Sequence, residues 1–292
     1  MTETQSTVRA ALWMGGSIAS FVTMTVAGRA IMPELDVFQV MEMRSVIGWF
    51  ILLPMVFAAG GFAAMRTRRP LQHIGRNVAH YAGQFLWLHA LTMIPLAELI
   101  SIEFTTPVWG ALLAVLFLGE RMSLRKAAAI LFGLVGVFII VRPGVTEADP
   151  GHLIMLAGAV GFGIALVMVK SLTRTDSVVA IIFWMLIIQS VIGLVPAIAV
   201  WQAPEPWMWP WIFVIAFTGM SSHFCMAGAL SHTETMVVMP MDFLRLPFFA
   251  LTGFLLYNER IDLYTAIGAA LILAGNLFNI QRRAREPEIA TS

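Results

Sequence analysis

The sequence predicts an all-α integral membrane protein of ten transmembrane helices, arranged as two inverted five-helix repeats around a central cavity. Three observations predict this fold class. Hydrophobic residues make up 59% of the 292 residues and charged residues only 12%, about half the charged share of a soluble domain. The apolar residues form ten runs, each close to the roughly 20 residues that a helix needs to cross a bilayer. A segment of the first half also recurs 139 positions later.

The ten predicted spans leave only short loops between them, so no soluble domain fits. Spans 3 and 4 are almost continuous, and Pro95 marks the break because proline ends a helix. The predicted spans are residues 10–28, 37–59, 77–96, 98–118, 126–142, 152–171, 177–200, 207–230, 236–257 and 263–281.

The internal repeat divides the chain into two related halves. Arg44 to Gly48 is echoed by Gln189 to Gly193, and the following pairs recur 139 positions apart: Ala90-Leu91 and Ala229-Leu230, Glu103-Phe104 and Asp242-Phe243, Glu120-Arg121 and Glu259-Arg260, Gly136 and Gly275. We expect repeats at residues 8–142 and 151–283, followed by a tail at 284–292. Five spans per repeat is an odd number, so the second repeat enters the membrane with the opposite orientation.

The basic residues predict that both termini of this multi-pass protein lie in the cytoplasm, and the cell inner membrane is its expected location. Three of them fall in the predicted outer loops (Arg29, Arg142 and Arg260) and thirteen on the predicted inner side: Arg9, Arg66, Arg68, Arg69, Arg76, Arg121, Arg125, Lys126, Lys170, Arg174, Arg282, Arg283 and Arg285. The tryptophans around residues 201–211 are typical of an interfacial belt. A cleaved signal peptide in place of span 1 is the alternative, but nine spans would break the symmetry.

The sequence lacks the signatures of soluble enzymes and of bound cofactors. It contains no GxxxxGK[ST] loop, no GxGxxG, no HExxH and no CxxC, so we expect no cofactor, no metal and no catalytic residue. Its net charge of +1 suggests no nucleic-acid partner, and the lone Cys225 excludes an internal disulfide. Ser221, Ser222 and His223 leave a membrane-embedded hydrolase as a minor alternative, since serines in a span commonly bond their own helix.

Polar residues inside the spans are the candidate binding residues, because each is costly in a bilayer. One face of span 3 carries a polar stripe at helical spacing, made of Asn77, His80, Gln84 and Trp87, with Tyr81 and His89 to the side. Amide, imidazole and indole groups together suit a polar-aromatic solute in a cavity. The alternative is an interhelical hydrogen-bonded seam.

Span 2 carries Gln39, Glu42 and Arg44 near its outer end. Glu42 and Arg44 point in different directions, so Arg44 is expected to reach an acid on a neighbouring span, Glu98 or Glu103. Structural ion pairing and a role in substrate electrostatics are both open for this group.

Glu103 and Asp242 occupy the same position in the two repeats, and inversion places Glu103 in the outer half of the membrane and Asp242 in the inner half. Asp242 and Arg245 are three residues apart, which favours a local ion pair. Helix breaks beside buried charge are where transporters place gates or ligands. Such breaks are expected at Pro107, Pro240 and Pro247.

The repeated pairs Glu120-Arg121 and Glu259-Arg260 lie in tight turns, and we interpret them as structural. Ser123 and Asp262 can cap the helices that follow. Glycines on spans 5 and 10 permit close helix packing: Gly133, Gly136, Gly268 and Gly275.

At this point the residues show a family resemblance. The run from Pro107 through Ala111-Leu112-Leu113-Ala114 to Phe117-Leu118-Gly119-Glu120-Arg121, then Gly133, Gly136-Val137 and Arg142-Pro143, resembles the drug/metabolite transporter superfamily of EamA type. Asn258-Glu259-Arg260-Ile261-Asp262 and Gly268 are the counterpart in the second half, where Asn258 replaces Gly119 and Gln189 replaces Arg44. The pattern is specific to the superfamily and not to a substrate.

The resemblance implies ten helices in inverted halves, alternating access, and a small-molecule substrate carried through the lipid bilayer. We expect an exporter of small metabolites, with amino acids, including aromatic ones, as the leading class. Uptake of an organic anion or vitamin, bound by Arg44 and Arg245, is the main alternative, and an enzyme or receptor is a minor one. Protons are a candidate coupling partner, and a monomer is expected. The predicted substrate-binding residues are His80, Tyr81, Gln84, Trp87, Glu42, Arg44, Glu103, Asp242 and Arg245.

Overall fold

A computed structural model describes residues 3–118, 124–142, 149–232, 238 and 241–280. This described part is helical throughout and contains no strand. The helices are α1 (Glu3–Ile31), α2 (Val37–Ala58), the short 3-10 helix η1 (Phe62–Met65), α3 (Pro70–Leu91), α4 (Leu96–Glu103), α5 (Thr106–Leu118), α6 (Leu124–Val141), α7 (Pro150–Leu172), α8 (Val178–Ala199), α9 (Met208–His232), α11 (Arg245–Tyr257) and α12 (Leu263–Ile280).

The helices confirm an all-α membrane protein. Among the described residues, six stretches are long and apolar enough to cross a membrane, namely α1, α2, α4 with α5, α7, α8 and α9. Three shorter apolar helices, α6, α11 and α12, and the more polar α3 occupy the remaining predicted spans. The start of span 3 was predicted too late: α3 begins at Pro70, so Arg76 lies within the helix and is buried there.

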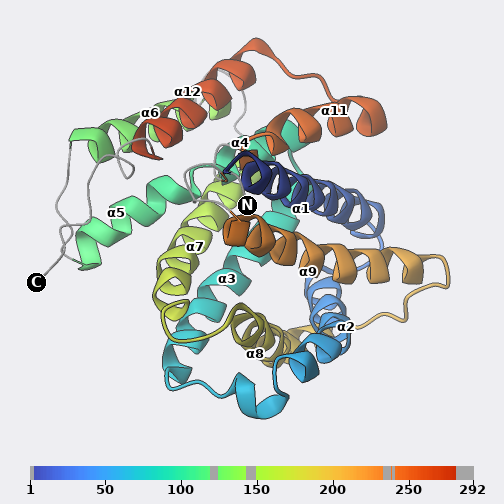
Figure 1. The fold of residues 1–292 in the computed structure, drawn as a ribbon. Helices are drawn as coiled ribbons and strands as arrows, with labels where there is room; N and C mark the ends of the chain where they lie inside the picture. Colours follow the sequence, from blue (N-terminus) through green and yellow to red (C-terminus); the bar gives the residue numbers. More distant parts are fainter. Residues whose placement is uncertain (1–2, 119–123, 143–148, 233–237, 239–240, 281–292) are drawn as a thin grey trace, which may run out of the picture.

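The packing of the helices follows the predicted inverted symmetry. α1 packs along α9, and α3 packs along α7, so the first helix of each repeat lies against the third helix of the other (Figure 1). α2 packs against α8, and α6 packs against α12, so these helices pair with their own counterparts. Interchanging the halves reproduces every one of these pairings, as a two-fold axis between inverted repeats requires.

Glycines allow α6 and α12 to approach closely, as predicted. A Cβ atom on Gly136 would lie 2.6 Å from the carbonyl oxygen of Gly268, and one on Gly268 would lie 2.5 Å from that of Gly136. A Cβ on Gly133 would meet Val108 of α5 at 2.7 Å. Without hydrophobic drive between helices in lipid, such close van der Waals packing is a main source of helix association.

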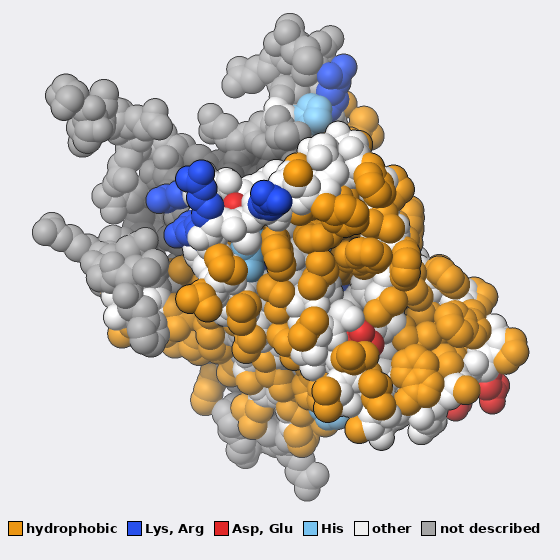
Figure 2. Space-filling view, turned by 90° about the horizontal axis from the view of Figure 1, so that it is seen from below, with side chains coloured by type: hydrophobic (Ala, Val, Ile, Leu, Met, Phe, Trp, Pro, Cys, Tyr) orange, Lys and Arg blue, Asp and Glu red, His pale blue; other side chains and the backbone are white. Residues whose placement is uncertain are grey.

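The outer surface of the bundle suits lipid. Figure 2 shows a face covered largely by hydrophobic side chains, with Lys and Arg gathered toward one edge. Exposed apolar residues occur on many of the helices, among them Phe50, Phe57, Val195, Phe217 and Leu255. A soluble protein rarely exposes so large an apolar surface. Trp201, Trp207, Trp209 and Trp211 are also exposed, as an interfacial belt requires.

One end of the bundle, which we call the Glu259 end, contains the turns after α1, α3 and α11. The Glu259 carboxylate accepts a hydrogen bond from the backbone N–H of Leu96 at 2.8 Å and forms an ion pair with Arg29. Arg142 pairs with Asp262, which also caps α12 by accepting from the Thr265 N–H at 2.7 Å. Glu259 and Asp262 therefore have the structural roles predicted for them, whereas Glu120, Arg121 and Ser123 lie outside the described residues.

The opposite end, which we call the Asp176 end, contains the turns after α2 and α7. Asp176 lies 2.7 Å from His73 Nε2 and accepts a hydrogen bond from the Thr67 hydroxyl at 2.8 Å. Arg69 donates to the backbone oxygen of Ser171 at 2.9 Å. These bonds join the start of α3, in the first repeat, to the α7–α8 turn of the second.

Candidate functional site

Two broken helices meet in the interior of the bundle. α4 ends at Glu103 and α5 begins at Thr106, with Pro107 as its second residue; α11 begins at Arg245, with Pro247 as its third. Proline lacks an N–H and is tolerated in the first turn of a helix, which explains why the new helices start there. The breaks predicted at Pro107 and Pro247 are present, and Pro240 lies outside the described residues.

Arg245 is the centre of the polar contacts at these breaks. Its guanidinium donates to Asp242 Oδ2 at 2.9 Å and to Glu103 Oε1 at 3.0 Å. Trp87 of α3 donates its indole N–H to the other oxygen of Glu103 at 2.7 Å. The rings of Phe21 and Phe104 lie 4.8 and 5.0 Å from the guanidinium carbon, within cation–π range. Two carboxylates and two aromatic faces thus surround one cation.

These contacts bear on two expectations about the buried charges. The ion pair between Asp242 and Arg245 is present as predicted. Glu103 and Asp242, which were expected in opposite halves of the membrane, both bind the same guanidinium. The broken ends of the two related helices therefore meet, as the packing of α4 against α11 also shows.

Arg44 of α2 has a different partner from the one predicted. Its guanidinium donates to Gln84 Oε1 of α3 at 2.8 Å. Neither expected acid reaches it, since Glu103 pairs with Arg245 and Glu98 binds His152 at 2.6 Å. Within the described part of the chain, no carboxylate forms an ion pair with Arg44. Its recorded hydrogen-bond partner is therefore a neutral amide.

The polar stripe of α3 is buried along its length, and most of it contacts other helices. Asn77, His80, Gln84 and Trp87 are each at most 8% exposed. His80 Nδ1 lies 2.9 Å from the Gln189 amide of α8, while Gln84 and Trp87 bind Arg44 and Glu103. His89 is exposed and lies apart from this group. The stripe therefore forms an interhelical hydrogen-bonded seam at His80 and contacts buried charged side chains at Gln84 and Trp87.

Glu42 and Tyr81 form a separate buried group beside α8. Ser190 donates its hydroxyl proton to Glu42 Oε1. Among the described atoms, Glu42 Oε2 and the Tyr81 hydroxyl are buried without a hydrogen-bond partner. Both lie 2.8 Å from the position that a Cβ atom on Gly193 would take. Glycine at this position lets an acid and a phenol approach the α8 backbone together.

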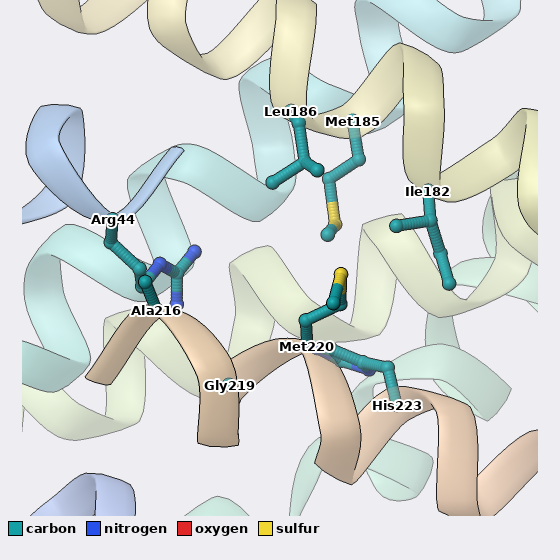
Figure 3. Close-up of a pocket in the computed structure, with 8 residues that line it drawn as sticks. All are labelled: Arg44, Ile182, Met185, Leu186, Ala216, Gly219, Met220 and His223. Carbon is teal, nitrogen blue, oxygen red and sulfur yellow. The ribbon is translucent and has the colours of Figure 1, made fainter. Parts of the chain in front are cut away.

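Two adjoining cavities lie between α8 and α9. A space of about 10 Å³, enough for one water molecule, is lined by Arg44, His223 and apolar residues, and Met185 and Met220 face each other across it (Figure 3). A cavity of about 300 Å³ lies nearer the Asp176 end and shares Ile182 with the first; its wall includes Trp13, Phe224 and His232. The two cavities share the Ile182 side chain in their walls, and Arg44 lines only the smaller one.

Sequence reasoning missed three contributors to this region. His223 lines the cavity beside Arg44; the sequence analysis considered it only for a hydrolase, although an ionisable residue inside a span also signals a cavity-lining role. Arg76 was assigned to a loop, although it is buried and donates to Asn77 Oδ1 at 2.7 Å. Nothing in the sequence indicated that Phe21 contacts Arg245, because a phenylalanine in an apolar span is usually a packing residue.

Comparison with known proteins identifies the family. A model described as the EamA-like transporter family matches residues 8–142 and again residues 149–281. The chain belongs to the EamA-like transporter family. It is therefore a membrane transporter, and each half carries one copy of the family's repeat, in agreement with the internal duplication.

Relatives of this EamA-like transporter include carriers that are named for their substrates. The riboflavin transporter of Rhizobium johnstonii is 32% identical to this chain over 232 residues. The matched region covers 78% of this chain and 76% of that transporter. The S-adenosylmethionine uptake transporter of Rickettsia felis is 25% identical over 268 residues, which cover 92% and 91%. A solved crystal structure, 18% identical, has a TM-score of 0.63 over 95% of this chain and 99% of its own, and shows the fold alone.

Proposed function

We propose that this protein takes up a planar heteroaromatic metabolite across the membrane, with riboflavin as the leading candidate. Two relatives are named as a riboflavin transporter and an S-adenosylmethionine uptake transporter. Those names support the vitamin-uptake alternative better than amino-acid export, which the sequence analysis put first. Both named substrates join a flat nitrogen heterocycle to a polar chain.

The observation that carries the proposal is the state of Arg44. It is a guanidinium inside the membrane whose hydrogen-bond partner is the neutral amide of Gln84. A guanidinium has five N–H donors, so most of them remain for acceptors on a solute. The ring carbonyl oxygens of a flavin are such acceptors, and they need no compensating charge. Arg245, in contrast, is neutralised by Glu103 and Asp242 and is a weaker candidate for binding a solute.

A flat ring also needs aromatic side chains to stack against, and the aromatic groups near Arg245 provide them. Phe21 packs edge-on against Trp87, with ring centroids 5.6 Å apart, and its centroid is 5.8 Å from that of Phe249. Aromatic rings in such clusters bind a further ring by stacking or edge contact. In this proposal, His80, Tyr81, Gln84 and Trp87 of α3 form the wall between the Arg44 donors and the aromatic cluster.

S-adenosylmethionine is the second candidate, and Glu42 is the observation that favours it. This buried carboxylate has one oxygen without a partner among the described residues, and a cationic solute would satisfy it. Arg44 would repel a cationic solute at the cavity that it lines, however, and for this reason riboflavin ranks first.

Counterflow in proteoliposomes tests the substrate. Vesicles loaded with riboflavin, S-adenosylmethionine or tryptophan are diluted into a trace of the same labelled solute. We expect accelerated exchange of riboflavin. Exchange of tryptophan alone would replace this proposal with amino-acid transport, and exchange of S-adenosylmethionine alone would make the second candidate the substrate.

Variants of Arg44 connect the activity to the site. Arg44→Gln should weaken riboflavin exchange about tenfold, since a hydrogen bond to a charged donor contributes about 1.5 kcal/mol. Arg260→Gln, at an exposed position of the Glu259 end, is the matched control and should exchange normally. Growth of a riboflavin auxotroph on low external riboflavin, when it expresses the wild-type protein, tests uptake as the direction.

A further inference from the structure

The group around Glu42 contains a buried acid without a cation. Glu42 is 5% exposed and Tyr81 is 6% exposed, so neither side chain reaches bulk water. Ser190 satisfies one oxygen of the carboxylate, and the other oxygen lies beside the unpartnered Tyr81 hydroxyl against Gly193. The two unpartnered oxygen atoms share one small space between α2, α3 and α8.

The surrounding elements provide little to balance a negative charge. α8 carries no ionisable residue, and α9 carries His223, Cys225 and His232, none of them a permanent cation. On α3 the nearest groups are Tyr81 and His80, and the latter is bound to Gln189. Arg44, on the same helix as Glu42, points toward Gln84 instead. In the described part of the chain, no basic side chain forms an ion pair with Glu42.

An ionised carboxylate in this environment is expensive, because burial removes its hydration without supplying a counter-charge. A proton on Oε2 removes that cost. A metal ion fits less well: these oxygens are too few to complete a shell, and the described residues hold no cluster of His, Cys, Asp or Glu of metal-binding size.

The acid is present in only one of the two halves. Arg44 to Gly48 aligns with Gln189 to Gly193, so the position equivalent to Glu42 is Ile187. The two repeats therefore have the same fold, but only the first has a titratable residue at this position of its second helix.

We propose that Glu42 is the proton-binding site of this transporter and that its protonation drives substrate uptake. Tyr81 and Ser190 are positioning residues that hold the carboxyl against Gly193. The site lies in the early turns of α2, toward the Glu259 end, and is distinct from the Arg44 donors. This inference rests on the proposed uptake of riboflavin for its driven-transport assay, but proton binding itself can be measured without any substrate.

The first experiment is infrared difference spectroscopy of the purified protein, without substrate, between acidic and alkaline buffer. We expect a protonated-carboxyl C=O band that is lost in Glu42→Gln and retained in Glu103→Gln, whose native acid is paired with Arg245. An unchanged band in Glu42→Gln would overturn the proposal. Tyr81→Phe keeps the acid, so its retention of the band separates loss of the acid from general misfolding.

The second experiment compares driven uptake with exchange in proteoliposomes. In the wild type, a proton gradient directed into the vesicles should accelerate riboflavin uptake several-fold. Glu42→Gln should lose this acceleration, measured as the ratio of riboflavin uptake with the gradient to uptake without it, so that a change in basal exchange does not affect the readout. Acceleration by a sodium gradient in place of the proton gradient, or by a proton gradient in Glu42→Gln, would overturn the inference. Absence of riboflavin counterflow in the wild type contradicts the proposed substrate, and the infrared test then decides on Glu42.

A third measurement tests the positioning role of Ser190. Its hydroxyl donates to Glu42 and stabilises the ionised form, so Ser190→Ala should move the half-maximal pH of driven uptake upward. Ser177→Ala, at the exposed start of α8, should leave the profile unchanged. An identical profile in Ser190→Ala and the wild type would contradict the placement of the proton on Glu42.

Discussion

Arg245 Nη1 donates to Glu103 Oε1 at 3.0 Å, so a cation of the second repeat binds an acid of the first repeat in the interior of the bundle. The same guanidinium holds Asp242 at 2.9 Å, and Trp87 satisfies the second oxygen of Glu103. The broken helices of the two halves are thus joined by charge as well as by packing. Any movement of one repeat against the other has to preserve or exchange these bonds.

Loss of the cation should destabilise the protein more than loss of either acid. Arg245→Gln leaves two buried carboxylates without a counter-ion, at a cost of about 3 to 5 kcal/mol, whereas Glu103→Gln leaves Arg245 paired with Asp242 and costs about 1 to 3 kcal/mol. Melting temperatures of the detergent-purified variants measure this order. Glu34→Gln, at an exposed position, is the control. Equal melting of Arg245→Gln and the wild type would show that the three charges do not stabilise the fold.

Stability should return only when all three charges are removed. Asp242→Asn with Arg245→Gln leaves Glu103 with the Trp87 N–H alone, so this double variant should remain unstable. Adding Glu103→Gln removes the last buried charge, and the triple variant should recover most of the wild-type melting temperature. Full recovery in the double variant would mean that Glu103 is not part of the network.

A single methyl group at the α6–α12 contact should separate these helices. The Cβ atom of Gly136→Ala would lie 2.6 Å from the Gly268 carbonyl oxygen, well inside van der Waals contact, and overpacking of this kind costs about 1 to 3 kcal/mol. Gly15→Ala on α1 is the matched control, because its Cβ would meet no atom within 4 Å. Thermal unfolding should distinguish the two variants, and equal melting would mean that the two helices do not pack this closely.

The contact between His73 and Asp176 should make stability depend on acidity. Burial alone would raise the pKa of Asp176, but hydrogen bonds from His73 and Thr67 outweigh it and hold that pKa below its usual value. Stability from this group is therefore present above the unfolded-state pKa of about 3.9 and is lost as the pH falls through the lower folded-state pKa. The melting difference between the wild type and Asp176→Asn should be constant above about pH 5 and disappear in stronger acid. A difference that grows on acidification would have the wrong sign.

The distribution of basic residues predicts which end faces the cytoplasm. In a Cys225→Ser background, an impermeant thiol reagent applied to intact cells should label Glu34→Cys, at the Glu259 end, and not Arg68→Cys, at the Asp176 end. Both positions are exposed. Permeabilised cells should label both, which controls for reactivity. The reverse pattern in intact cells would invert the orientation.

Much of the fold could be predicted from composition and from local patterns in the sequence. Composition predicted a membrane protein, and the odd number of spans in each repeat predicted their inversion. Prolines at positions 107 and 247 predicted broken helices, and the spacing of Asp242 and Arg245 predicted an ion pair within one helical turn. Each of these depends on residues a few positions apart, or on properties summed over a whole segment.

Contacts between helices were decided only by the tertiary structure. Arg44 was expected to find an acid and instead binds Gln84, Glu103 joins Asp242 at Arg245, and Glu42 lies against Gly193 without a cation. The rotation and depth of each helix determine which buried side chains meet, and both depend on how all the helices pack together. A shift of one residue along α-helical geometry turns a side chain by about 100° and moves it about 1.5 Å, so sequence spacing alone cannot assign partners across helices.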